Sequence, residues 1–311
     1  MGSLSTYWHL ADLGRPPTDY EIATSRLLYH VGRGFEVDVP LADWYRRHQV
    51  GSALRCDDWE RFHDPRATTY AAYVAGRAAS EEALDGGARP ALAADWMAAL
   101  AQLLPPALYL FHGLQMVSAY VGQMAPSGRL TIAAALQAAD EMRAVERLAR
   151  RTAALRATEP GLGRDGKSRW QTDPAWQPAR RLIETMLVTY DWGEAFAAAN
   201  LCAKPALDAF FWQQLREVAQ GRGDLLLGAT LASLAEDAAW HRAWSEALVA
   251  VAFQADPANR DTLADWVAKW NRPVREAVRA LGPLAGPAGA AAAEAALEQA
   301  STWQRRLEVG R

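Results

Sequence analysis

Two short stretches of the sequence carry the residue types and spacing of a metal-binding helix motif, and each lacks one ligand. Glu141 and Ala144 stand three residues apart, as do Ala238 and His241. Residues three apart share one face of a helix, so a Glu-x-x-His pair can bind one metal pair from a single helix turn. Helical bundles that hold two metal ions need this pair on two helices, plus a Glu from each of two others. Because a methyl group cannot ligate iron, the sequence predicts the frame of a metal-oxygenase bundle without the metal.

Lys204 is a candidate for the space between these two motifs. Counting back from Ala238 along the helical hairpin places Lys204 where a third helix would offer its carboxylate. We hypothesise that its ammonium occupies the metal volume and pairs with Glu141, which would face His241 across the bundle. The alternative is an ordinary buried polar pair, which is costly unless it is hydrogen-bonded. Either way, no catalytic, cofactor-binding or metal-ligating residue is expected in this chain.

The elements that would position these residues are helices throughout. The pair of helices predicted at 108–124 and 130–157 resembles the pair predicted at 191–215 and 224–252. Each pair ends in one of the incomplete motifs. This is the two-pair layout of a ferritin-like four-helix bundle with a long crossover. The chain is therefore predicted to be all-α, a ferritin-like bundle of about ten helices with no convincing sheet.

Local signals predict where several helices begin and end. Asp64 followed by Pro65 is a typical start signal, with a capping carboxylate and a proline at the first helical position. Pro105 and Pro106 are predicted to break the chain into two helices, because proline lacks the N–H that the helix interior needs. Asp224 is predicted to cap the helix that carries His241.

The chain is predicted to have three parts. Residues 1–56 look like an extended arm rich in aromatic side chains, which either packs on its own domain or wraps a partner subunit. Residues 57–281 form the ferritin-like domain, with its crossover near 158–177. Residues 282–311 form an Ala-rich C-terminal helix.

Composition excludes several classes of protein. The 311 residues are 50% hydrophobic and 22% charged, with a formal net charge of −3. This balance gives no electrostatic reason to bind nucleic acid or an anionic membrane. The two cysteines, Cys56 and Cys202, fit a reducing cytoplasm and exclude a disulfide framework. The most apolar run, 103–124, contains prolines and polar residues and is expected to be a buried core helix rather than a membrane span.

Other polar residues receive structural interpretations. His112 is expected to be a hydrogen-bonded core or interface residue, and Glu194 a helix cap or part of an ion pair. The glycine-rich stretch 161–166 follows no strand and is expected to be a loop. A series of arginines is interpreted as a solvated face or an interface with an acidic partner: Arg143, Arg147, Arg150 and Arg151.

Two further motifs identify a family. The runs Tyr-Leu-Phe-His-Gly-Leu-Gln-Met at 109–116 and Asp-Trp-Gly-Glu-Ala-Phe at 191–196 are quite specific. With them, the chain resembles the β subunit of a bacterial multicomponent monooxygenase hydroxylase, of the toluene, phenol and alkene group. The resemblance covers about residues 6 to 275. Shorter matching stretches lie at 17–22, 42–45, 57–60, 64–66, 118–120 and 123–126.

The resemblance implies a non-catalytic role in a larger enzyme. Such hydroxylases are (αβγ)₂ assemblies whose α subunit holds a diiron site, while the β subunit shares the fold and supplies structural support. The implied partners are the α and γ subunits, a second β subunit, an effector protein, a reductase and, in some systems, a Rieske ferredoxin. The implied reaction is O₂- and NAD(P)H-dependent hydroxylation or epoxidation of small aromatic or alkene hydrocarbons, in the cytoplasm.

Two alternatives remain open at this point. One is a self-sufficient dimetal oxidase, and the other is a free-standing helical binding module with a ligand pocket in its core. Bound iron in the purified chain would favour the first, and purification without a large diiron subunit would favour the second.

Overall fold

The computed structural model describes residues 41–66, 69–85 and 91–310, together with Pro16 and Thr18. The chain divides into two units between Arg46 and Arg47. Within the first unit, the short helix α2 (Leu41–Tyr45) is described. The other residues of the predicted arm up to position 40, Pro16 and Thr18 apart, lie outside the described residues. The next element, η2 (Arg46–Val50), begins at the last residue of the first unit, and all elements after it belong to the second unit.

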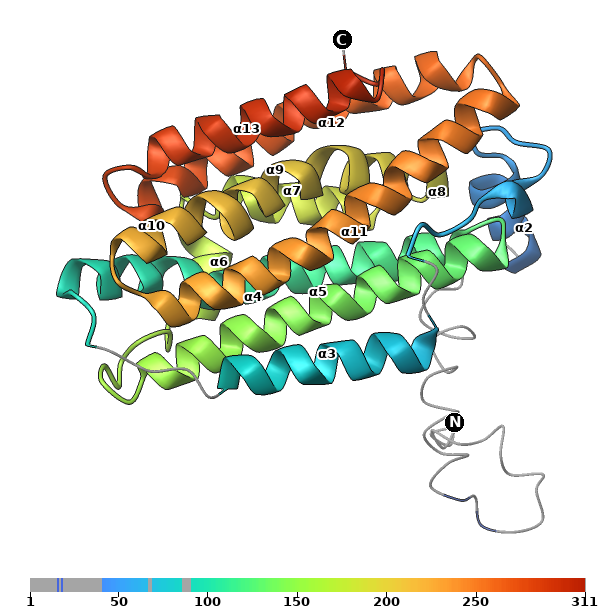
Figure 1. The fold of residues 1–311 in the computed structure, drawn as a ribbon. Coiled ribbons are helices and arrows are strands. Elements are labelled where there is room, and N and C mark those ends of the chain that lie inside the picture. The colour runs from blue at the N-terminus through green and yellow to red at the C-terminus, as the bar shows by residue number, and fades with distance from the viewer. Residues whose placement is uncertain (1–15, 17, 19–40, 67–68, 86–90, 311) are drawn as a thin grey trace, which may run out of the picture. The chain divides into compact units, whose positions relative to one another are not determined.

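The first of two long hairpins contains α4 (Ala94–Met124) and α5 (Gly128–Leu155), which run in opposite directions (Figure 1). The turn between them is short, and the Ser127 hydroxyl caps α5 by accepting from the backbone N–H of Leu130 at 3.3 Å. Most of α4 is apolar and buried, so this helix forms much of the core.

The second hairpin pairs a long helical run with α11 (Leu225–Ala255), which lies antiparallel to α5 (Figure 1). The predicted cap of α11 is confirmed, since the Asp224 carboxylate accepts from the backbone N–H of Leu227 at 3.1 Å. The helical run before it consists of α8 (Trp192–Phe196), the π-helical η4 (Ala197–Ala203), α9 (Lys204–Asp208), the π-helical η5 (Ala209–Gln214) and α10 (Leu215–Gly221).

Shorter and outer helices cover these two hairpins. Helices α6 (Gly166–Thr172) and α7 (Gln177–Leu187) pack on α4, and α3 (Tyr70–Asp85) contacts α11. Helix α12 (Asn259–Leu281) packs on η4, and α13 (Gly289–Arg306) packs on η5. The remaining elements are η2 (Arg46–Val50), η3 (Trp59–Arg61) and η6 (Gly282–Ala285). The described residues contain no strand, and the prediction of an all-α bundle is confirmed.

The prediction that Pro105 and Pro106 break the chain into two helices is wrong, because α4 continues through both. Both prolines are buried, and the crossover packs closely against the first of them. A Cβ added to Gly166 would lie 2.6 Å from Cβ of Pro105, and one on Gly163 would lie 2.8 Å from its Cγ. This packing offsets the hydrogen bonds that the two prolines remove from the helix.

The helix predicted to start at Asp64 and Pro65 begins instead at Tyr70, as α3. Asp64 accepts from the backbone N–H of Arg66 at 2.9 Å and from its guanidinium at 3.3 Å. A carboxylate that bonds the backbone two residues on stabilises a turn rather than a helix start.

Both ends of the described second unit bond to the bundle. Ser52 donates to Asp191 at 2.8 Å, and Asn259 exchanges two hydrogen bonds with the backbone of Arg55. At the other end, Trp303 on α13 donates to Glu246 on α11 at 2.6 Å. Among the described residues, one helix, α4, is long and apolar enough to cross a membrane, but 61% of its most apolar window is buried, as in the core helix of a soluble bundle.

Candidate functional site

The residues singled out by the two motifs meet between α5, α9 and α11. The Lys204 ammonium forms an ion pair with Glu141 and lies 3.2 Å from the second carboxylate, Asp208. His241 is the third neighbour, with Nδ1 3.8 Å from Oε1 of Glu141. Ala144 and Ala238 are buried on α5 and α11. The predicted contact between Lys204 and Glu141 is therefore present.

The local backbone around Lys204 is irregular. Pro205 has no N–H, so a regular α-helical ladder cannot run through this position. The N–H of Lys204 bonds to the carbonyl of Ala199, five residues back, which is the π-helical pattern. Two π-helical segments thus flank the single turn that carries Lys204 and Asp208.

Burial and neighbouring charges shift the pKa values of Lys204, Glu141 and His241. Lys204 and Glu141 expose only 3% and 2% of their surface. Burial lowers the pKa of Lys204, but the carboxylates of Asp208 and Glu141 outweigh it and leave that pKa above its usual value. Burial raises the pKa of Glu141 to about 7, against the opposing effect of Lys204. Burial and the nearby Lys204 lower the pKa of His241 to about 4, so its imidazole is neutral at pH 7.

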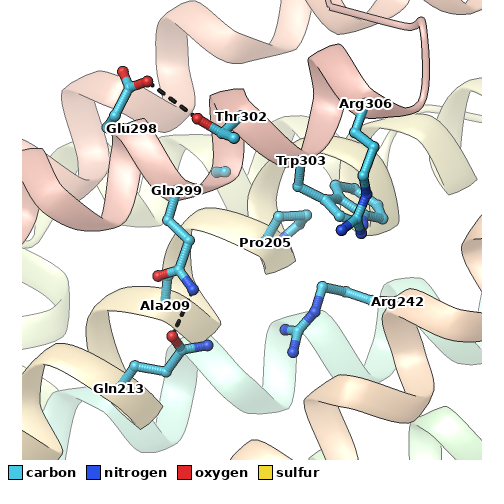
Figure 2. Close-up of a pocket in the computed structure, with 10 residues that line it drawn as sticks. Pro205, Ala209, Gln213, Arg242, Glu298, Gln299, Thr302, Trp303 and Arg306 are labelled. Carbon is cyan, nitrogen blue, oxygen red and sulfur yellow. Dashed lines mark hydrogen bonds between the residues drawn. The ribbon is translucent and has the colours of Figure 1, made fainter.

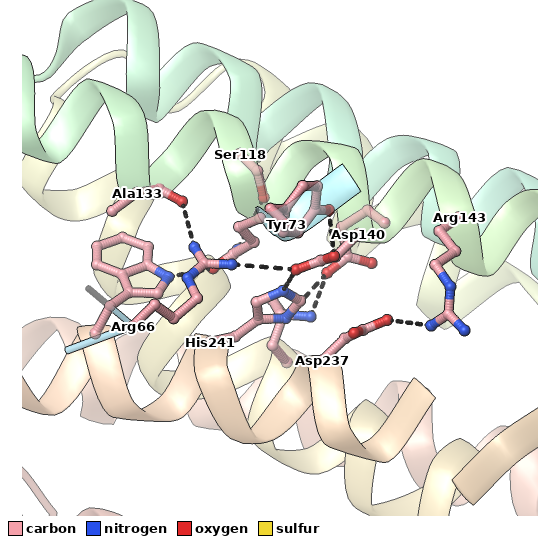
Figure 3. Close-up of polar contacts among 12 residues, drawn as sticks. Arg66, Tyr73, Ser118, Ala133, Asp140, Arg143, Asp237 and His241 are labelled. Carbon is pink, nitrogen blue, oxygen red and sulfur yellow. Dashed lines mark hydrogen bonds and ion pairs between the residues drawn. The ribbon is translucent and has the colours of Figure 1, made fainter. Parts of the chain in front are cut away.

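A second buried carboxylate, Asp140, organises the side of the site toward α3. It lies 3.1 Å from Nε2 of His241, accepts from the Tyr73 hydroxyl at 2.5 Å, and lies 3.3 Å from the Arg66 guanidinium. Figure 3 shows these side chains converging on Asp140. Burial would raise the pKa of Asp140, but its bond and attraction to His241, with help from Tyr73, lower it below the usual value.

The charged network continues one turn further along α11, at Asp237. Arg143 donates to Asp237 at 2.5 Å (Figure 3), and Arg77 from α3 also pairs with it. Arg143 and Arg147 in turn bind Glu81 on α3. Each buried carboxylate on this side thus faces at least one cation, which is the condition for burying charge at tolerable cost.

A network of uncharged polar side chains adjoins these charges, around Gln137 on α5. The Gln137 and Asn200 amides exchange two hydrogen bonds, at 3.1 and 2.8 Å, and Gln137 also bonds Ser118 and the indole N–H of Trp244. Such satisfied networks fix the register between helices rather than perform chemistry.

The donor set does not fit a dimetal centre. Two of the motif positions hold methyl groups, and an ammonium rests on the carboxylates that would otherwise attract a metal cation. Within the part of the chain that the structure describes, no three His, Cys, Asp or Glu side chains are arranged to hold a metal ion.

The other polar residues singled out in the sequence have mixed outcomes in the structure. The predicted ion pair of Glu194 is confirmed, with Lys269 at 2.5 Å. His112 is exposed on α4, so it is not a core residue. The interpretation of the arginine series is wrong for Arg143, Arg147 and Arg151, which are buried. They bind acidic residues of the same chain, and only Arg150 lies on the solvated face.

The fold and the site define a class: an all-α bundle of paired helical hairpins, with buried ion pairs where its metal-binding motifs are incomplete. Comparison with known proteins gives the family. A sequence model of the methane/phenol/alkene hydroxylase family matches residues 43–256. The chain belongs to this family.

Individual relatives agree with that assignment. The β subunit of the hydroxylase component of the toluene-4-monooxygenase system of Ectopseudomonas mendocina is 33% identical over 288 residues, 88% of each chain. The phenol 2-monooxygenase oxygenase component DmpL of Pseudomonas sp. (strain CF600) is 27% identical over 261 residues, 78% of this chain and 76% of that one.

Solved structures share the fold. A chain of toluene 4-monooxygenase, solved with toluene bound in the resting active site, superposes with a TM-score of 0.77 at 32% identity, covering 92% of this chain and 99% of that one. A chain of xenon-pressurized phenol hydroxylase from Pseudomonas sp. OX1 gives a TM-score of 0.75 at 21% identity, covering 94% and 91%, and supports the fold alone.

Proposed function

We propose that this chain is a non-catalytic, structural β subunit of a multicomponent monooxygenase hydroxylase. The observation that carries the proposal is the buried pair of Lys204 with Glu141. Oxygen activation at a carboxylate-bridged site needs metal ions where this chain has an ammonium and two methyl groups. The similarity to a hydroxylase β subunit along 88% of the chain supports the same role.

The reaction belongs to the assembly rather than to this polypeptide. The α subunit is proposed to hold the diiron site and to oxidise small aromatic or alkene hydrocarbons with O₂ and NAD(P)H. Relatives named for toluene and phenol oxidation favour aromatic substrates. No step of that chemistry is assigned to a residue of this chain.

The proposed partners follow from the same role. They are the α and γ subunits in an (αβγ)₂ assembly, a second β subunit across the dimer, an effector protein, a reductase and, in some systems, a Rieske ferredoxin. Neither nucleic acid nor a membrane is a proposed partner, and the proposed location is the cytoplasm.

Co-purification tests the proposal. The tagged full-length chain, expressed with the genes that neighbour its own, is expected to bring down a larger subunit with two intact Glu-x-x-His motifs. Hydrocarbon oxidation should require that subunit and be absent from the tagged chain alone. Recovery of the chain without any such subunit, from cells that make both, would contradict the proposal.

A further inference from the structure

A pocket separate from the buried ion pairs lies where α13 packs on η5 and α11. Its volume is about 370 Å³, within the range of small-ligand sites. Arg242 on α11 and Arg306 on α13 line it from opposite walls, and Trp303 forms part of the surface beside them (Figure 2). Gln299 donates to Gln213 at 2.6 Å and closes one side.

The two arginines are presented differently. Arg306 is 69% exposed and donates to Glu246 at 2.9 Å, and the same carboxylate oxygen accepts from the Trp303 indole at 2.6 Å. Arg242 is half-buried and has no hydrogen-bond or ion-pair partner among the residues that the structure describes. Figure 2 shows its guanidinium turned toward the space below Pro205 and Trp303.

The acids at this pocket already accept hydrogen bonds from other side chains. The acid that lines it, Glu298, already accepts from Thr302 at 3.1 Å and from Arg305 at 2.8 Å. Glu246 is likewise occupied. The donors of Arg242, and those of Arg306 that do not bind Glu246, are left facing the opening. A guanidinium presents several donors in a fixed fork that matches a carboxylate or phosphate.

We propose that this pocket binds an anionic oxygen group, a carboxylate or a phosphate, held between Arg242 and Arg306. The ligand has two sources with the same chemistry: a small free anion, or an acidic side chain of another subunit. That the pocket binds an anion rests on the pocket alone, whereas a partner subunit as the source of that anion rests on the proposed role in a hydroxylase.

The test is calorimetric titration of the full-length chain with inorganic phosphate and, separately, with glutarate. Arg242→Gln and Arg306→Gln should each weaken binding about ten-fold or more, the effect of losing a charge-assisted hydrogen bond. Arg272→Gln is the matched control, since it removes the same charge from an exposed position outside the pocket and should leave binding unchanged. Circular dichroism should show all three variants folded.

Phosphate titration of the assembled complex distinguishes the two sources of the anion. Phosphate binding that persists after assembly with partner subunits identifies a free anion, whereas binding that disappears identifies a partner's carboxylate as the occupant. Two results would overturn the proposal: no binding of either probe to the full-length chain, or equal weakening by Arg272→Gln and Arg242→Gln. Neither result bears on the co-purification experiment.

Discussion

Replacing Lys204 by methionine should destabilise the fold severely, although methionine nearly matches the lysine in volume. The substitution leaves Glu141 and Asp208 buried without their shared cation. Removing one partner of a buried ion pair typically costs about 3–5 kcal/mol. A value near 3 kcal/mol is expected here, because Glu141, with its pKa raised to about 7, can take up a proton and relieve part of the cost.

The pH dependence of this loss has a definite sign. Without Lys204 the folded-state pKa of Glu141 rises further, while its unfolded pKa stays ordinary. Stability contributed by a raised carboxyl pKa is present at low pH and is lost as pH rises through the folded value. Because Glu141 of the parent chain already has a pKa of about 7, the two chains differ mainly above that pH. The destabilisation by Lys204→Met should therefore shrink by about 1–2 kcal/mol between pH 8.5 and pH 7.

Urea denaturation at both pH values measures this, in a double-mutant cycle with Glu141→Gln. The double variant should recover at least ~1 kcal/mol relative to the sum of the single changes. Lys269→Met is the control, because Lys269 is 61% exposed in its pair with Glu194 and should cost about 1 kcal/mol or less. A Lys204→Met variant as stable as this control, with no coupling to Glu141, would refute the reasoning.

Two further predictions concern stability. As pH falls from 7 to 4.5, His241→Gln should lose less stability than the parent chain, by on the order of 1–3 kcal/mol. The reason is that an imidazole with a lowered pKa stabilises the fold at pH values above the ordinary histidine pKa, and this stability is lost as pH falls to about 4. Identical pH profiles of the two chains in chemical denaturation would contradict this. Gly113→Ala should lower the melting temperature, since the added Cβ would lie 2.4 Å from Cγ2 of Ile183. The matched change Gly76→Ala, at a helix position where an added Cβ would have nothing within 4 Å, should stabilise the fold by about 0.5–1 kcal/mol. A Gly113→Ala variant more stable than Gly76→Ala would contradict this account of the packing.

Helical spacing made the central contacts predictable from sequence. Once two hairpins are paired, residues at the same level of facing helices can be found by counting, which led from Ala238 to Lys204 and Glu141. Counting did not single out Asp208, although it stands one turn from Lys204 and shares its ammonium. The signal would have been a lysine and an aspartate four positions apart in an otherwise apolar helical run.

The contacts made by α3 could not be predicted in the same way. The sequence does not fix how this segment lies on α5, so Tyr73 and Glu81 gave no sign that they would cover Asp140 and the arginines. If α3 did not lie over it, Arg147 would be expected on a solvent-exposed face of α5. The continuation of α4 through Pro105 could not be predicted for a similar reason, because it depends on packing against Gly163 and Gly166 of the crossover.

Iron content of the separated subunits is the most direct test of the central claim, that this family member has no metal centre of its own. After purification of the full-length chain alone and of its complex, elemental analysis should find iron only in the complex, with the larger subunit. The chain alone should also remain free of iron when refolded with ferrous ion under anaerobic conditions. Stoichiometric iron bound to this chain, lost on Glu141→Gln or His241→Gln, would contradict the account.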